Sequence, residues 1–264
     1  SSDAANALAA RVALFQNKMT DAANYAEAVL ANSSFSLAST AMDFSKNWVA
    51  GSSSPEIIFA YVNNSRASSP LNFTLYVNDT DGSWNYAPSD WCYNSLFADD
   101  NTLSRKGDVR LKATFTSQDA NRVIKYPNGT YQLAETSDYT CTPVVISRIS
   151  EMYLIKAEAL GKTNGAAALV EYMKKRYTTA PSEAAIKALS DKEYQTLILD
   201  ERRREFYAEG MRWQDIKRTN RLELLETLDG RTYLMYYPIP QDEIDMAGTV
   251  AYPQNPGYAG YTGN

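Results

Sequence analysis

The residues of this chain best suited to ligand recognition are aromatic and polar side chains gathered between residues 81 and 94. Flat aromatic rings can stack on the C–H face of a pyranose, while Asp and Asn side chains hydrogen-bond to the hydroxyl groups around its rim. A short segment that carries both kinds of residue is therefore a candidate platform for a neutral oligosaccharide. The candidate ligand contacts are Trp84, Tyr86, Asp90, Trp91 and Asn94.

The same aromatic residues also allow a purely structural interpretation. Trp and Tyr side chains often anchor irregular segments to a hydrophobic core and leave only a polar tip in water. The sequence leaves ligand contact and loop anchoring open as alternatives for Trp84, Tyr86 and Trp91.

Catalytic chemistry finds little support in the sequence. The chain contains no histidine, which excludes Ser-His-Asp and Cys-His sites, a histidine general base and the usual catalytic zinc sites. It has no Walker or G-x-G-x-x-G nucleotide-binding loop. Aspartate pairs such as Asp79 and Asp81 could hydrolyse a glycosidic bond, but loop aspartates are far more often turn formers. We therefore expect no enzyme, no cofactor and no metal site.

The two cysteines, Cys92 and Cys141, have no metal-binding spacing. A disulfide between them would close a long loop and restrict the unfolded chain. The alternative is two buried free thiols, which behave as small hydrophobic groups.

Composition and charge narrow the range of partners. With a net charge of −5 and a pI near 5.0, the chain lacks the basic surface that displaces counterions from nucleic acid. No apolar run approaches the roughly 20 residues that a membrane-spanning helix needs. We expect no nucleic-acid partner.

Helical elements must position these residues. An alanine-rich segment, residues 4–30, has apolar residues at helical spacing and an interruption at 17–21, where Thr20 or Asp21 can cap a second helix. A second helical pair is expected from Arg148 to Tyr177, broken between Gly161 and Gly165. A third element opens at Ser190, with Glu193 at capping-box spacing. Helical pairs of this kind are typical of tetratricopeptide-like repeats.

The composition changes between the helical regions. The stretch from residue 33 to 143 is rich in Ser, Asn, Asp, Thr and aromatics, with short strands expected at 57–62 and 73–77. We expect a single domain with four parts: a helical pair at 1–32, an irregular candidate ligand-binding insertion at 33–143, helical repeats at 144–222, and an irregular C-terminal segment at 223–264.

A dense run of charges marks the segment from Asp200 to Arg218. Its pairs stand at the i,i+3 spacing at which helical side chains meet, next to large apolar residues. We interpret the run as structural, with its charges paired inside the protein and without catalytic duty. The pairs are Glu201 with Arg204, Arg202 with Glu205, and Glu209 with Arg212.

Several segments together resemble the SusD/RagB family. The charged run resembles the family's ERR-x-E-aromatic-x-x-EG-x-RW helix, and residues 148–159 resemble its R-x-x-EMYLI-x-AEA helix. The closing elements PIP-x-x-EI at 238–244 and QNPGY at 254–258 follow in the family's order. Weaker matches are the segment 55–59 around Glu56, and Asp108-x-Arg110.

This resemblance implies a mostly α fold, in which tetratricopeptide-like repeats carry a long insertion of loops and short strands. It implies a non-catalytic subunit that binds an oligosaccharide or polysaccharide beside a SusC-like TonB-dependent porter. It also implies a surface-exposed outer-membrane lipoprotein, with membrane contact only through a lipid anchor, and the sequence reads as a fragment without that anchor and the N-terminal part. The alternative is a protein-interaction scaffold that uses its helical repeats and binds no glycan.

Overall fold

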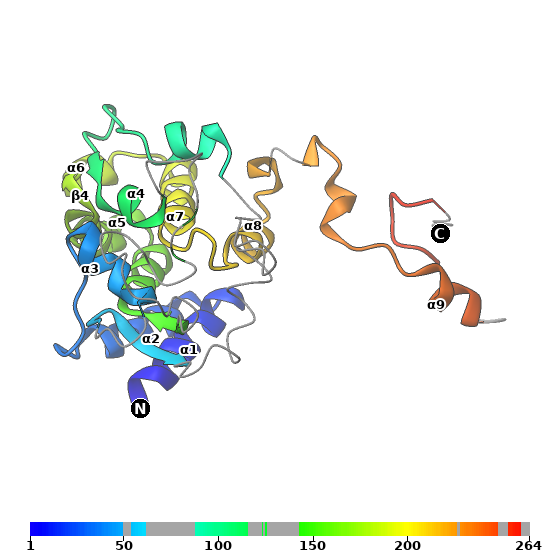
Figure 1. Cartoon of the computed structure of the whole chain (residues 1–264), viewed down its shortest axis with the longest axis horizontal. Coiled ribbons are helices and arrows are strands. Elements are labelled where there is room, and N and C mark those ends of the chain that lie inside the picture. The colour runs from blue at the N-terminus through cyan, green and yellow to red at the C-terminus, as the bar shows by residue number, and fades with distance from the viewer. Residues whose placement is uncertain are drawn as a thin grey trace, which may run out of the picture. The chain divides into compact units, whose positions relative to one another are not determined.

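The computed structural model describes residues 1–49, 54–61, 88–115, 123, 125, 143–225, 228–247 and 253–259 (Figure 1). The chain divides into two units, Ser1–Met211 and Arg212–Asn264. The sequence analysis expects a single domain whose C-terminal segment begins at residue 223. The boundary between the two units lies earlier in the chain, after Met211. Helices make up most of the described residues, which confirms the mostly α class.

The first two helices form an antiparallel pair. Helix α1 (Ser2–Phe15) begins at Ser1, whose side chain accepts a hydrogen bond from the amide of Ala4. Helix α2 (Met19–Leu30) begins after Lys18 without a side-chain cap. The expected caps at Thr20 and Asp21 are therefore wrong, because Asn17 turns the chain earlier through a left-handed backbone (φ 59°).

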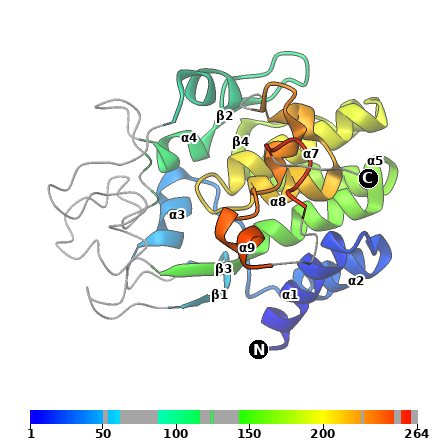
Figure 2. The ribbon, with the colours of Figure 1, turned by 90° about the vertical axis from the view of Figure 1, so that its right-hand side faces the viewer.

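Small residues let this pair pack closely. Ala10 and Ala22 are both fully buried, which allows the two backbones to approach. Figure 2 shows α1 and α2 along the beginning of helix α5 (Ile149–Arg176). Met152 and Ile155 of α5 join the hydrophobic cluster that α1 and α2 form.

Helix α5 connects this cluster to a second one. Its backbone is not helical at Gly161 (φ 65°, ψ 174°), so the chain changes direction there, where the sequence predicts a break. After the break, Leu169 and Tyr172 join Ile198 in the second cluster. A single helical segment thus contributes to both parts of the core.

The second cluster is completed by two helices that follow α5. These are α6 (Glu183–Lys187) and α7 (Asp191–Glu205). The predicted capping box of α7 is confirmed. The hydroxyl of Ser190 accepts from the amide of Glu193, and the carboxylate of Glu193 accepts from the amide of Ser190.

Short elements form the rest of the first unit. Strands β1 and β3 pair antiparallel, as do β2 and β4. The sequence analysis expects helical repeats from residue 144, but strand β3 forms there instead. Its residues Val144, Val145 and Ile146 are β-branched and favour a strand. The expected strand at 73–77 lies outside the described residues. The elements are α3 (Ala41–Ser45), η1 (Lys46–Trp48), β1 (Ile57–Tyr61), the π-helical turn η4 (Cys92–Leu96), β2 (Lys106–Asp108), α4 (Val109–Thr114), β3 (Val144–Arg148) and β4 (Tyr177–Thr179).

The C-terminal unit consists of short helices joined by irregular chain. Gln254 closes one of its loops, since its side chain accepts from the amide of Ile239 and donates to the carbonyl of the same residue. No helix among the described residues of either unit is long and apolar enough to cross a membrane. The helices of this unit are α8 (Arg212–Thr219), η6 (Leu222–Leu224), η8 (Thr232–Met235) and α9 (Gln241–Met246).

Gly165 allows the two parts of α5 to approach each other. A Cβ atom at Gly165 would lie 2.2 Å from the carbonyl oxygen of Ala157, which is backbone and cannot move aside cheaply. We expect Gly165→Ala to destabilise the protein by about 1 to 3 kcal/mol through overpacking, measured by urea unfolding. Thr163→Ala, at an exposed position in the same helix, should leave stability unchanged or slightly higher. Equal stability of Gly165→Ala and wild type would contradict this packing.

Candidate functional site

Three of the five candidate ligand contacts lie on one exposed helical turn. Asp90 and Trp91 open the turn that continues into η4, and Asn94 lies within it. All three side chains are exposed, and 43% of the surface of Trp91 is accessible. Trp84 and Tyr86 lie outside the described residues. The structure therefore places Asp90, Trp91 and Asn94 together at the surface.

The other side of this turn is anchored in a small aromatic cluster. Cys92, Leu96 and Phe97 are buried there against Phe115. The rings of Phe97 and Phe115 meet edge to face, with 5.3 Å between their centroids. Cys92, Leu96 and Phe97 thus anchor the turn, and part of the Trp91 side chain stays accessible to solvent.

Cys92 is a buried free cysteine. Burial raises the pKa of its thiol, so at neutral pH it is uncharged and packs as an apolar group. Cys141, the other half of the disulfide considered from the sequence, lies outside the described residues.

Two arginines of α7 hold the turn in place. The guanidinium of Arg203 lies over the ring of Trp91, 4.6 Å from its centroid. Arg204 donates through Nε to the carbonyl of Leu96 at 2.5 Å. The orientation of Trp91 therefore depends on helix α7. The spacing of the charged run predicts the helix, but it does not predict the stacking of Arg203 on Trp91.

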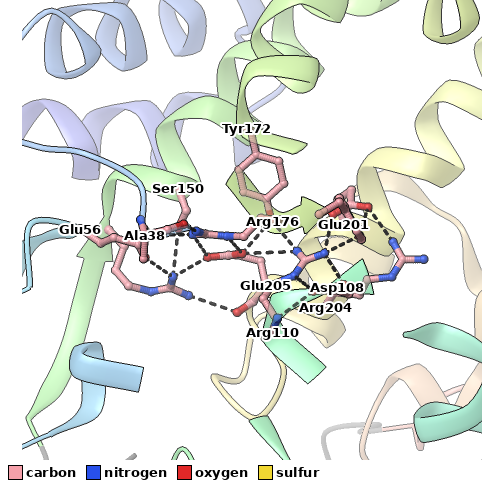
Figure 3. A network of polar contacts seen from close by, with 12 residues as sticks. Ala38, Glu56, Asp108, Arg110, Ser150, Tyr172, Arg176, Glu201, Arg204 and Glu205 are labelled. Carbon is pink, nitrogen blue, oxygen red and sulfur yellow. Dashed lines mark hydrogen bonds and ion pairs between the residues drawn. The ribbon is translucent and has the colours of Figure 1, made fainter. Parts of the chain in front are cut away.

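A buried carboxylate, Glu205, lies at the centre of a network of charges (Figure 3). Arg148 binds it at 2.5 Å and Arg176 at 2.9 Å. Arg110 approaches to 3.4 Å, and the hydroxyl of Tyr172 donates at 2.7 Å. The i,i+3 spacing predicts Arg202, on the same helix, as the partner of Glu205. The three arginines that bind Glu205 instead come from distant parts of the sequence.

Glu56 extends the network toward the start of the insertion. It accepts from Arg176 at 2.7 Å and from Arg148 at 3.3 Å. It also accepts from the backbone amide of Ala38 and from the side chain of Asn47. The weak sequence match at residues 55–59 thus contains a fully buried acid that fixes the loop at Ala38 and the short helix η1.

Glu201 extends the network in the other direction. It pairs with Arg204 at 2.8 Å, as the i,i+3 spacing predicts, and with Arg110 at 2.9 Å. Arg110 also pairs with Asp108 at 2.7 Å. The second weak match, Asp108-x-Arg110, therefore belongs to the same network.

Glu209 and Lys125 close the network at its edge. Lys125 donates to Glu209 at 2.8 Å and to the carbonyl of Glu205 at 2.9 Å, and its ammonium lies 4.5 Å from the centroid of the Trp48 ring. Glu209 pairs with Arg148 at 2.9 Å as well. Burial lowers the pKa of Lys125 to about 8, although the charge of Glu209 opposes this shift.

The electrostatics of the network keep its two central carboxylates, Glu201 and Glu205, ionised. Burial alone would raise the pKa of Glu205, but Arg176 and Arg148 hold it well below its ordinary value. Burial also opposes ionisation of Glu201, and the charges of Arg110 and Arg204 outweigh it, so the pKa of Glu201 is lowered. Such carboxylates do not exchange protons near neutral pH, as a general acid or base must. The network is built to hold elements together.

Metal binding gains no support from the described residues. Among them there is no group of three or more His, Cys, Asp or Glu side chains that could hold an ion. What the described surface does offer is a half-exposed indole beside an amide and a carboxylate on the turn at residues 90–94.

Comparison with known proteins places the chain in a family. The SusD family model matches residues 97–232, which is more than half of the sequence. The chain belongs to the SusD family. The matched region contains α4, α5 and α7, and with them Glu201, Glu205 and their arginine partners, whereas η4 precedes it.

Individual SusD relatives agree with this assignment. The chain is 30% identical over 142 residues to SusD-like protein P38 of Formosa agariphila, a match covering 49% of this chain and 27% of that one. A SusD superfamily protein from Bacteroides fragilis superposes with a TM-score of 0.67 at 20% identity, covering 98% of this chain and 65% of that one. Surface glycan-binding protein A from Bacteroides thetaiotaomicron superposes with a TM-score of 0.62 at 20% identity, covering 98% and 64%.

These SusD relatives are longer than the chain. It spans about a quarter of the curated relative and somewhat under two thirds of the two solved structures. At 20% identity the structural likeness establishes the fold.

Removing the central carboxylate should unfold the protein more readily. Glu205→Ala leaves three buried guanidinium groups without their shared partner, and we expect a loss of about 3 to 5 kcal/mol in the free energy of unfolding, measured in urea by circular dichroism. The control is Glu183→Ala, which removes an exposed pair with Lys187 and should cost less than about 1 kcal/mol. Similar stability of the two variants would show that the network is not central.

The network also predicts a dependence of stability on pH. Glu201 and Glu205 have lower pKa values folded than their ordinary value of 4.5. Their contribution is present above that value and is lost as the pH falls toward the folded pKa. We expect the melting temperature to drop when the pH is lowered below about 4.5, and to drop less steeply in Glu205→Gln. Parallel curves for variant and wild type would contradict this.

Proposed function

We propose that this SusD-family protein binds an oligosaccharide without catalysing its cleavage, and that Trp91 stacks on a sugar ring. The observation that carries the proposal is the exposed turn on which Trp91 stands beside Asp90 and Asn94. Family membership supports it, since one solved relative is described as a surface glycan-binding protein. A neutral oligosaccharide suits this turn, because its polar groups are an amide and a carboxylate.

The geometry of the turn fits sugar stacking. Asn94 follows Trp91 by three residues and Asp90 by four, so all three exposed side chains lie within about one turn of the chain. The contact with Arg203 orients the indole before ligand arrives, which reduces the entropy that binding must overcome. Trp84 and Tyr86 remain candidate contacts in the same insertion.

The wider setting follows from the family. We propose that the protein acts at the outer-membrane surface as a lipoprotein and delivers its ligand to a SusC-like TonB-dependent porter. It needs no cofactor or metal for this role, because stacking and hydrogen bonding suffice to hold a sugar.

A second candidate is a protein-interaction scaffold without glycan binding. One observation favours it: α1 exposes apolar side chains on one face, with Leu8 55%, Val12 46% and Phe15 38% accessible. Their spacing of four and three residues forms a single helical stripe, of a kind that protein partners cover. A carbohydrate array separates the two, since a scaffold leaves every sugar unbound.

Replacing the exposed indole tests the proposed function directly. Trp91→Ala should weaken binding of the oligosaccharide found on the array by roughly 1 to 3 kcal/mol, by analogy with the loss of an aromatic partner for a base. Isothermal titration calorimetry measures the change. Trp91→Phe should retain part of the affinity, because a ring remains to stack.

The control is Tyr25→Ala, which removes an aromatic ring of similar exposure, 41%, from α2. It should bind glycan as the wild type does. The melting temperature of Trp91→Ala should stay close to that of the wild type. Unchanged glycan affinity in this variant, or its failure to fold, would mean that Trp91 anchors the turn and that the site lies elsewhere.

A further inference from the structure

The C-terminal unit (orange to red in Figure 1) contains a pocket of about 590 Å³ formed by its own residues. This volume lies within the range of small-molecule sites and accommodates one or two sugar rings. Its lining combines aromatic, amide, hydroxyl and ammonium groups. The residues are Lys217, Asn220, Leu222, Thr232, Tyr233, Met235, Tyr236, Asn255 and Pro256.

The wall of this pocket is fixed by the QNPGY motif. The side chain of Asn255 donates to the carbonyl of Tyr237 at 2.8 Å, and the hydroxyl of Tyr258 donates to the carbonyl of Tyr236 at 2.7 Å. These bonds hold the segment that carries Tyr236 in an extended conformation beside the motif. The pocket is therefore built before any ligand arrives.

The glycine of the motif serves the same purpose. Gly257 has a left-handed backbone (φ 89°), and a Cβ atom there would lie 2.3 Å from the ring of Tyr233. That ring also meets the ring of Tyr258 edge to face, at 5.2 Å between centroids. The motif thus orients Tyr233, which lines the pocket.

The pocket combines an exposed aromatic ring with one positive charge. Tyr236 is 56% exposed, and the ammonium of Lys217 lies 5.5 Å from the centroid of its ring. Among the described residues that line the pocket, Lys217 alone is charged. An aromatic ring, two amides and an ammonium complement a sugar that carries a carboxylate.

We propose that this pocket binds a hexuronic acid residue of an oligosaccharide. The pyranose ring stacks on Tyr236, its carboxylate pairs with Lys217, and Asn220 and Asn255 bind its hydroxyl groups. This inference rests on the proposed function for the carbohydrate class of ligand. It adds a second site in a different unit from Trp91. This site prefers an anionic sugar, whereas the turn at Trp91 suits a neutral one.

The test uses the full chain and defined probes. These are short oligomers of galacturonate, glucuronate, mannuronate and guluronate, each beside its neutral hexose counterpart. At least one uronate should bind more tightly than its counterpart. Lys217→Met should lower the affinity for that uronate about tenfold and abolish the preference over the neutral sugar, since it removes a charge-assisted contact. Tyr236→Ala should lower the same affinity about tenfold through loss of stacking.

Matched controls keep this test specific. Tyr237→Ala changes the neighbouring ring, which is 91% exposed and does not line the pocket. Lys174→Met removes an exposed ammonium from α5. Both should bind the uronate as the wild type does. Because Lys217 is itself exposed, its variant will fold and carries the test even if Tyr236→Ala does not.

The result also separates the two proposals. If a neutral glycan binds and depends on Trp91, while no uronate binding depends on Lys217 or Tyr236, the proposed function stands and this inference is wrong. If uronate binding depends on Lys217 and no glycan binding depends on Trp91, the inference stands and the proposed site at Trp91 is wrong. Absence of binding to every carbohydrate overturns both.

Discussion

The first unit depends on one buried carboxylate, Glu205, that three arginines share. Arg110, Arg148 and Arg176 lie in different segments of the chain, and all three meet at this acid. A buried ion pair adds little net stability, because desolvation offsets most of the Coulomb attraction, but removal of one partner is costly. We therefore regard specificity as its contribution, since other arrangements of the same helices would leave buried charges unpaired.

The network also explains why distant motifs occur together in this sequence. Glu56 stands at the start of β1 and Asp108 at the start of α4, and both bind arginines that reach into the core. Because Arg110, the partner of Asp108, also pairs with Glu201 of α7, the insertion is fastened to the repeats at both of these points. Each motif supplies at least one charge to a cluster that is satisfied only when all of them are present.

Helix α7 links this interior to the candidate site. Glu201 and Glu205 face the core, while Arg203 stacks on Trp91 and Arg204 binds the carbonyl of Leu96. The exposed turn is therefore positioned by the element that the network holds most firmly. A rigid interior and an exposed, pre-oriented ring suit the proposed binding role, because affinity improves when little order must be gained on binding.

Local spacing in the sequence predicts several features of the fold correctly. The capping box at Ser190, the break at Gly161 and the pairing of Glu201 with Arg204 all depend on residues within one or two turns of each other. The partners of Glu205, the strand β3 and the stacking of Arg203 on Trp91 were decided by tertiary structure. Those contacts join residues far apart in the chain, and their geometry exists only after the helices have packed.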